Sequence, residues 1–399
     1  MKTLNNFWAW FLNDSSRDKK SLIDTEILYS AILLIAIGII FVYSASIAYA
    51  VRDTSLHSQY YYLIRHLFYI LVGMLCAIGV FNLPTAMLKK YAFHISIIII
   101  ILLIGVLIPH IGRVVNGSRR WIGFGMINIQ PSELAKLGMA IYLSHYICSK
   151  TAGLKNFVND IVPIFLIIGL VDGLLLLEPD MGSATVVFII ALGVLYMANL
   201  DKKIILGFSS IGVVGFVVLI LIAPYRMRRV LGFIDPWQDA LGKGYQLTHS
   251  LLAVGHGGWL GVGLGNSIEK LFYLPEAHTD FILAIIAEET GVIGVSIILI
   301  LFWIIFYRGF AIVGVEASKL PGRKFQGLLA QGISLWFFAQ TVVNVGVAVG
   351  ALPTKGLTLP FISFGGSSIV VSCIALAILL KIDYENRQIK RGIMLDEHI

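Results

Sequence analysis

Runs of about twenty apolar residues recur along the whole chain, and they constrain its fold more than any other feature. A helix needs roughly 20 such residues to cross a bilayer. Of the 399 residues, 58% are hydrophobic and only 13% are charged, too few charges for a soluble protein of this length. Lipid cannot satisfy backbone polar groups, and the runs are too long for barrel strands. The sequence therefore predicts an all-α, polytopic integral membrane protein of about ten transmembrane helices.

The apolar runs place the membrane spans, and the basic residues between them orient the chain. Lysine and arginine are more frequent in the segments that share a side with the N-terminus, which predicts that both termini are cytoplasmic. We expect a cytoplasmic N-terminal segment at 1–26, a membrane domain at 27–381 with a large periplasmic loop at 225–280 between helices 7 and 8, and a cytoplasmic tail at 382–399. The expected spans are 27–47, 61–82, 91–109, 131–149, 158–177, 182–199, 203–224, 281–307, 326–350 and 363–381.

Charge and cysteine content exclude two classes of function. The net charge of +7 is spread in short clusters between apolar runs, so topology explains it better than nucleic-acid binding, which we exclude. The three cysteines show no CxxC spacing and lie in or beside apolar runs, which favours neither a disulfide framework nor a metal site.

Two expected outer loops stand out. The loop at 110–130 carries basic residues, and the loop at 225–280 is too long for a simple connector. Within the second, 238–254 predicts a short helix on the membrane surface. The glycine-rich piece that follows, GHGGWLGVGLG (255–265), does not match a dinucleotide fingerprint.

The span at 131–149 is the most polar, because it contains Glu133 and Lys136 one helical turn apart. We expect it to cross the membrane with its polar side facing protein or water. Two interpretations stay open at this point: a buried ion pair that only neutralises itself, or a cation held at the outer edge for an anionic headgroup with Glu133 fixing its rotamer.

Acidic and basic residues near the outer ends of other spans are further candidates. In EPD (178–180) the carboxylates can stabilise a helix start, and for Asp180 we favour a role in holding a cation or a basic residue. Arg120 has the planar fork that suits phosphate, and Trp121 could stack on a sugar. The residues alone favour the other interpretation, an ordinary solvated basic loop with a tryptophan at the membrane interface. Arg65 is a buried cation whose simplest partner would be a carboxylate such as Asp172.

His278 and Asp280 lie where the long loop enters the eighth span. Thr279 or Asp280 is a natural N-cap, so a structural role is a strong alternative. A carboxylate at the boundary of water and lipid, beside a histidine, is also well placed as a general base.

Six long motifs follow one another along essentially the whole chain. They are NGSRRWIGFG (116–125), IQPSELAKL (129–137), LEPDMGSA (177–184), GYQLTHSLLAVGHGGWLGVGLGNS (244–267), LPEAHTDFILAIIAEETG (274–291) and LPTKGLTLPFISFGGSS (352–368). In this order they resemble the motifs of the SEDS family (shape, elongation, division and sporulation). LPTKGLTLPFIS is closer to the cell-division branch than to the elongation branch.

The resemblance implies a peptidoglycan glycosyltransferase that polymerises lipid II at the outer face of the cytoplasmic (inner) membrane, at the division septum. The family's essential aspartate matches Asp280. Its other important charged positions match Arg65, Arg120, Glu133, Lys136 and Asp180. The implied partners are lipid II, a class B penicillin-binding transpeptidase and other division proteins.

In the expected inverting reaction, Asp280 takes the proton of the acceptor 4-hydroxyl while Lys136 and Arg120, supported by Arg65, stabilise the departing diphosphate. Trp121 and His278 are further candidates for substrate contact. No cofactor is required, although a divalent cation could share the charge. The alternatives are a lipid II flippase and a non-catalytic scaffold of the division machinery.

Overall fold

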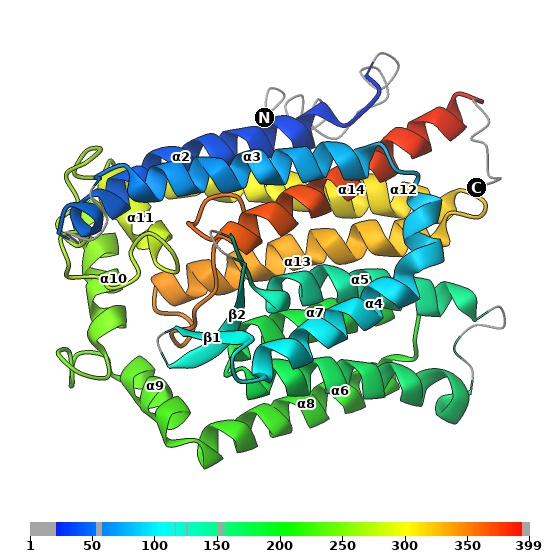
Figure 1. Ribbon diagram of the computed structural model, residues 1–399, viewed down its shortest axis with the longest axis horizontal. Helices are drawn as coiled ribbons and strands as arrows, with labels where there is room; N and C mark the ends of the chain where they lie inside the picture. The colour runs from blue at the N-terminus through cyan, green and yellow to red at the C-terminus, as the bar shows by residue number, and fades with distance from the viewer. Residues whose placement is uncertain are drawn as a thin grey trace, which may run out of the picture.

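The computed structural model describes residues 21–52, 58–115, 117–124, 127–150, 154 and 156–392. Most of the expected N-terminal segment, the end of the expected tail and five short pieces in between lie outside these ranges. Long helices run side by side along the longest axis of the molecule (Figure 1). The all-α polytopic fold class is confirmed.

Ten long helices of the described chain correspond to the ten expected spans. Eight helical segments of the described chain are long and apolar enough to cross a membrane, and two of them, Phe157–Leu177 and Ile282–Lys319, join neighbouring helices. The ten are α2 (Thr25–Arg52), α3 (Tyr61–Phe81), α4 (Thr85–Leu107), α5 (Pro131–Ser149), α6 (Val162–Leu177), α7 (Met181–Met197), α8 (Lys202–Ile222), α11 (Ile282–Tyr307), α13 (Lys324–Ala348) and α14 (Gly366–Lys390).

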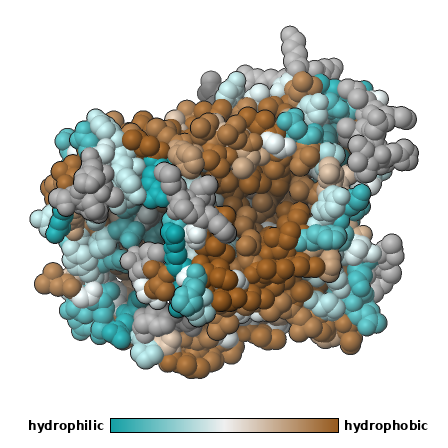
Figure 2. Space-filling view, in the orientation of Figure 1, coloured by the Kyte–Doolittle hydropathy of each residue, from teal (hydrophilic) through white to brown (hydrophobic). Residues whose placement is uncertain are grey.

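The core forms around α13, which buries most of its residues against α5, α7 and α11. Helix α5 likewise buries most of its length, including Glu133 and Lys136, so its polar side faces protein. Helix α8 differs, because none of its residues is buried. Figure 2 shows an apolar surface across the middle of one face, with hydrophilic residues gathered toward both ends, as embedding in a bilayer requires.

Shorter elements complete the two ends of the bundle. Helices α9 and α10 lie at one end, and we call this the pocket end (Figure 1). Helix α12 and the C-terminal part of α14 lie at the other, which we call the opposite end. The shorter helices are η2 (Phe157–Ile161), α9 (Pro224–Ile234), α10 (Tyr245–Gly257), η3 (Arg308–Gly314) and α12 (Val315–Lys319). The short surface helix expected within 238–254 corresponds to α10.

The structure differs from the sequence expectations in three places. The loop at 110–130 forms an antiparallel sheet, β1 (Gly112–Val115), β2 (Ser118–Phe124) and β3 (Ile127–Ile129). The expected eighth span is broken at Gly291, whose φ of 65° and ψ of −165° suit glycine. The last span continues past residue 381 to Lys390, and Asp383, Glu385 and Arg387 are buried in the bundle.

Candidate functional site

A cavity of about 520 Å³, open to solvent, lies at the pocket end. Five segments that are far apart in the sequence build it: β2, the turn between α6 and α7, the end of α8, α9, and the loop between α13 and α14. Its lining residues are Arg120, Pro179, Asp180, Met181, Gly182, Phe216, Ile220, Arg229, Val230, Pro353, Thr354, Lys355 and Gly356.

Strand β2 brings Arg120 to the cavity. Its guanidinium group donates hydrogen bonds to the backbone carbonyl oxygens of Glu178 (3.1 Å) and Pro179. These two bonds fix the orientation of the side chain, but a carbonyl does not cancel a full positive charge. Within the described part of the chain, no carboxylate forms an ion pair with Arg120, so its charge remains available to an anion in the cavity.

Asp180 both caps a helix and lines the cavity. Its carboxylate accepts hydrogen bonds from the backbone N–H of Ser183 (3.1 Å) and from the Ser183 hydroxyl (2.8 Å) at the start of α7. The neighbouring Glu178 is fully buried, and neither of its carboxylate oxygens has a hydrogen-bond partner. Burial, with a contribution from the Asp180 charge, raises the pKa of Glu178 to about 9. Glu178 is therefore neutral at pH 7, and Asp180 carries the charge of this turn.

Lys355 and Arg229 are two cavity cations that the sequence did not single out. The Lys355 ammonium donates a hydrogen bond to Thr185 (3.1 Å) and lies 4.6 Å from the centre of the Phe216 ring. Burial lowers the pKa of Lys355 to about 8. Lys355 is part of LPTKGLTLPFIS. It could have been recognised as a candidate from the sequence, because it is a single lysine in an otherwise apolar loop between two spans. Arg229 belongs to a run of basic residues on α9. This pattern is common in helices at the membrane interface, so it does not single out Arg229.

Asp280 lies beside this cavity. A Cβ atom added to Gly356, which lines the cavity, would lie 2.9 Å from the Asp280 carboxylate oxygen Oδ2. The amide of Asn344 on α13 donates to the backbone carbonyl of Asp280 (3.0 Å) and to that of Leu357 (2.7 Å), so it joins the two loops. Burial, then the Glu276 charge, raises the pKa of Asp280 to about 7, while Arg120 opposes this rise.

The capping alternative for Asp280 is not observed. Helix α11 begins at Ile282, and its N-cap position is Phe281, which makes no side-chain capping bond. Thr279 instead donates its hydroxyl proton to Glu276. Local helix stability therefore does not account for a carboxylate at position 280.

Glu133 and Lys136 form a buried ion pair, the first of the two interpretations left open by the sequence. Lys136 is fully buried, and its ammonium contacts Glu133 Oε1 (2.7 Å) and Gln340 Oε1 (2.8 Å). The indole N–H of Trp336 donates to the same Gln340 oxygen (2.6 Å). Neither Glu133 nor Lys136 lines the cavity. The contacts thus favour a structural role that ties α5 to α13.

His278 and Arg65 occupy aromatic surroundings near Asp280 rather than the cavity lining. The buried His278 ring lies 4.7 Å from the Tyr62 ring and 5.6 Å from the Phe364 ring, measured between centres, and its Nδ1 has no partner. Arg65 donates to the Tyr61 hydroxyl (2.7 Å). The His278 contacts join the loop that carries Asp280 to α3 and to the segment before α14.

The remaining predictions are placed as follows. Asp172, expected as a partner of Arg65, has no hydrogen-bond partner at Oδ1. Trp121 is half-buried in β2, opposite Arg113 in the sheet, and does not line the cavity. Among the described residues, no three His, Cys, Asp or Glu side chains are arranged to hold a metal ion, and the divalent cation stays a prediction.

Comparisons with known proteins identify the family of the chain. A family model described as cell cycle protein, FTSW_RODA_SPOVE, matches residues 24–388. A protein of Aromatoleum aromaticum named probable peptidoglycan glycosyltransferase FtsW is 48% identical over 372 residues, which cover 93% of this chain and 90% of that protein.

Two solved structures share the fold. A chain of a peptidoglycan synthase complex, described in terms of coordinated polymerization and crosslinking, superposes with a TM-score of 0.73 at 30% identity and covers 91% of this chain and 98% of that one. The rod shape determining protein RodA of Thermus thermophilus gives a TM-score of 0.66 at 29% identity and covers 92% and 97%. The matching motifs, the helical membrane fold and these relatives together show that the chain belongs to the FtsW/RodA/SpoVE family of cell cycle proteins.

Proposed function

We propose that this protein is a peptidoglycan glycosyltransferase of cell division that polymerises lipid II at the cavity beside Asp280. The observation that carries the proposal is the arrangement of charge. One carboxylate with a raised pKa lies at the edge of a cavity that Arg120, Arg229 and Lys355 line. A relative that is 48% identical over most of the chain is named a probable peptidoglycan glycosyltransferase, which supports the same reaction.

Asp280 is suited to remove a proton from an alcohol. The acceptor 4-hydroxyl is a poor nucleophile at neutral pH, so a base must take its proton as the new glycosidic bond forms. A base works best when its pKa is close to the operating pH, and burial brings the pKa of Asp280 to about 7. Asn344 holds the backbone of Asp280, and Gly356 leaves room for its carboxylate.

The three cavity cations are suited to receive the leaving group. As the bond to the anomeric carbon breaks, the polyprenyl diphosphate gathers negative charge. Arg120 is already fixed by two carbonyl groups, so little reorganisation is needed when this charge develops. Direct attack by the 4-hydroxyl inverts the anomeric centre. Arg229 and Lys355 take the role that the sequence analysis gave to Lys136, whose ammonium is engaged by Glu133.

The proposed orientation places the pocket end at the periplasmic face and both termini in the cytoplasm, at the division septum. Lipid II reaches the cavity from the outer leaflet. A class B penicillin-binding transpeptidase and other division proteins are the proposed partners. The first is supported by the likeness to a chain of a synthase complex that couples polymerization to crosslinking.

Labelled lipid II given to the purified chain, with and without the transpeptidase, tests the function. Polymer is expected from the wild type, and none from Asp280→Asn, because an amide cannot accept the proton. The matched control is Asp239→Asn, an exposed carboxylate at the same end that lies outside the cavity lining. Wild-type polymer from Asp280→Asn would contradict the base assignment.

Two other outcomes would contradict the proposed function itself. Movement of lipid II between leaflets without polymer would identify a flippase. Neither movement nor polymer, from a folded chain with its partner present, would identify a scaffold. Folding of each variant is checked by its thermal unfolding in detergent.

A further inference from the structure

The glycine-rich loop at 258–265 takes no part in the cavity, although it is a conspicuous motif of the sequence. Its residues, GWLGVGLG, include no polar side chain. The large side chains are nonetheless turned outward, since Trp259 is 76% exposed, Leu260 78% and Leu264 65%. Apolar residues gathered on an outer surface usually mark a contact with lipid or with another protein.

Backbone hydrogen bonds hold this loop against the broken part of α11. The amide groups of one segment pair with the carbonyl groups of the other in both directions. The four bonds are Val262 N to Glu288 O (2.9 Å), Gly263 N to Glu289 O (3.1 Å), Val292 N to Gly258 O (2.9 Å) and Ile293 N to Trp259 O (3.3 Å). The exposed side chains therefore project from a fixed backbone.

Two glycines make this close approach possible. A Cβ atom on Gly261 would lie 2.2 Å from the Glu289 carbonyl oxygen, and one on Gly291 would lie 2.5 Å from the backbone of Trp259. Both glycines also have positive φ angles, of 80° and 65°. Any other residue would clash with backbone and would be strained.

Two buried carboxylates of α11 fasten the rest of the loop. Glu288 accepts hydrogen bonds from the Ser267 hydroxyl and from the amide of Ile268 (3.0 Å). Glu289 forms an ion pair with Lys270 (2.6 Å). The glycine-rich loop is thus fixed both by its own backbone and by the segment that follows it.

The exposure of α11 changes where the loop meets it. Before the break at Gly291, the helix from Ile282 to Glu289 is buried within the protein. After the break its apolar side chains become exposed, with Val292 48%, Ile293 48% and Ile297 51% exposed. Trp259 lies beside Ile293, because its carbonyl oxygen accepts a hydrogen bond from the amide of Ile293. The outward side chains of the loop therefore continue the apolar surface of α11.

We propose that the glycine-rich loop 258–265 is a membrane-interface anchor that inserts Trp259 and Leu260 into the lipid leaflet at the pocket end. Tryptophan is favoured at this depth because its ring is apolar and its N–H is polar. The loop is bonded to α11, and the start of α11 follows Asp280 at the edge of the cavity. An anchored loop therefore fixes the depth of the cavity relative to the lipid headgroups. The inference rests on membrane embedding and is independent of the proposed reaction.

Lipid is favoured over a second protein as the occupant of this surface. Apart from the indole N–H of Trp259, the surface contains no charged or hydrogen-bonding side chain between residues 258 and 265, so it offers a partner protein only one polar contact. It is also continuous with an exposed apolar helix face that a bilayer must cover.

A fluorescent probe at position 260 tests the anchor. The full chain is prepared with Cys76, Cys148 and Cys373 replaced by serine, and Leu260→Cys is labelled with an environment-sensitive dye. The matched control is Lys243→Cys, an exposed polar position of the same end. Both proteins are placed in vesicles of phosphatidylethanolamine and phosphatidylglycerol. Quenching of the dye is then measured with two quenchers, one attached to lipid near the headgroup and the other aqueous iodide.

The probe at position 260 is expected to emit at shorter wavelength than the control, to be quenched by the lipid-borne quencher and to be shielded from iodide. Equal quenching of both probes by iodide would overturn the anchor. Shielding of position 260 that arises only after a purified transpeptidase is added would also overturn it, in favour of a protein contact.

A second measurement needs no cysteine replacement and so does not depend on the folding of that variant. Tryptophan emission of the wild type in the same vesicles is compared with that of Trp259→Phe. The substitution is expected to remove a component that the shallow lipid quencher reaches. If the fraction quenched by that lipid is the same in both proteins, Trp259 does not lie in the leaflet.

Discussion

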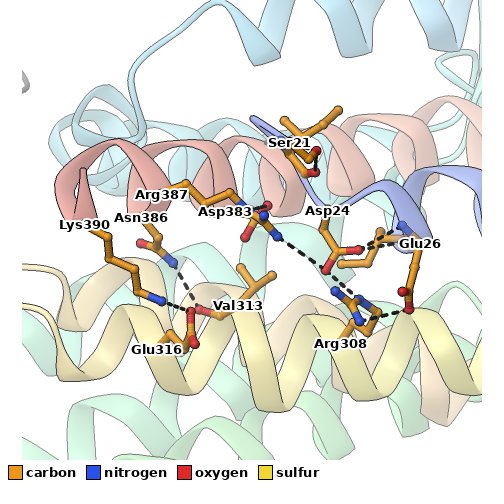
Figure 3. Close-up of polar contacts among 12 residues, drawn as sticks. Ser21, Asp24, Glu26, Arg308, Val313, Glu316, Asp383, Asn386, Arg387 and Lys390 are labelled. Atoms are coloured by element: carbon orange, nitrogen blue, oxygen red, sulfur yellow. Dashed lines mark hydrogen bonds and ion pairs between the residues drawn. The ribbon is translucent and has the colours of Figure 1, made fainter. Parts of the chain in front are cut away.

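The opposite end of the bundle and the cavity at the pocket end handle charge in opposite ways. At the opposite end, Arg308 contacts Asp24 (2.6 Å) and Glu26 (2.9 Å), and Arg387 contacts Asp383 (2.8 Å), so each cation has a carboxylate beside it (Figure 3). At the pocket end, Arg120 is held by carbonyl groups and lines a cavity with two more cations.

This difference separates structural charge from charge that can act on a substrate. Ion pairs that satisfy each other tie distant segments together, since Asp24 precedes α2 while Arg308 follows α11. Cations without a carboxylate partner raise the free energy of the empty site, and an anionic ligand relieves that cost. The opposite end is thus expected to respond to substitution by unfolding, and the pocket end by loss of activity.

The largest expected effect is on stability, from Arg308→Met. This substitution takes away the nearer of the two arginines beside the buried Asp24, since Arg387 lies 4.0 Å from its carboxylate. Removing one member of a buried ion pair typically costs about 3–5 kcal/mol. The free energy of unfolding in detergent should fall by that amount, while polymer formed per folded molecule stays close to the wild type. An unchanged unfolding transition would mean that the network in Figure 3 contributes nothing to stability.

At the pocket end, Lys355→Met should lower the rate of polymerisation by about 10²–10³-fold, the usual cost of losing one electrostatic contact to a transition state. Its stability should stay unchanged or rise, because the substitution removes a buried cation. Steady-state rates and thermal unfolding are measured on the same sample. The comparison between the two ends fails if Lys355→Met unfolds the protein while retaining its activity.

The pH dependence of the rate sharpens the assignment. A general base must be deprotonated, so with the pKa of Asp280 at about 7 the rate should fall about tenfold for each pH unit below that value. The pKa of Lys355, at about 8, predicts a second fall as the pH rises and the ammonium loses its charge. A profile that is flat between pH 5 and 7 would exclude Asp280 as the base.

The smallest effect is expected from Lys390→Met at the opposite end. Lys390 pairs with Glu316, but both side chains are well exposed, at 43% and 38%. Exposed ion pairs contribute only about 0.2–1 kcal/mol. Unfolding of this variant, measured beside Arg308→Met, shows whether burial of the pair decides its contribution. A loss as large as that of Arg308→Met would contradict this view.

The positions of the long helices could be predicted because hydropathy depends on local sequence. The end of α14 could not, since Asp383 and Arg387 look like part of a polar tail. They are buried as an ion pair with each other, with Asp24 from the start of the chain 4.0 Å from Arg387. The sheet at 112–129 was missed because its strands are short. The break at Gly291 depends on contacts with Gly261, which no local pattern records.

Part of the site could be predicted from residue chemistry. Arg120, Asp180 and Asp280 were singled out as charges near span ends, and the structure brings them to one cavity and its edge. Sequence could not decide whether the pair of Lys136 with Glu133 is only structural or also serves an anionic headgroup, and the structure buries this pair away from the cavity lining. Lys355 was overlooked because a single lysine in a loop is ordinary until its neighbours are known.

A Cβ atom at position 356 would lie 2.9 Å from the Asp280 carboxylate oxygen Oδ2, so even the methyl group of alanine would force that carboxylate to shift. Homologues in which the aspartate is still catalytic should therefore keep glycine at this position. Homologues that have lost the activity should show other residues there. The identity of residue 356 in a distant homologue can then serve, from genome sequence alone, as a test of whether that homologue still polymerises glycan.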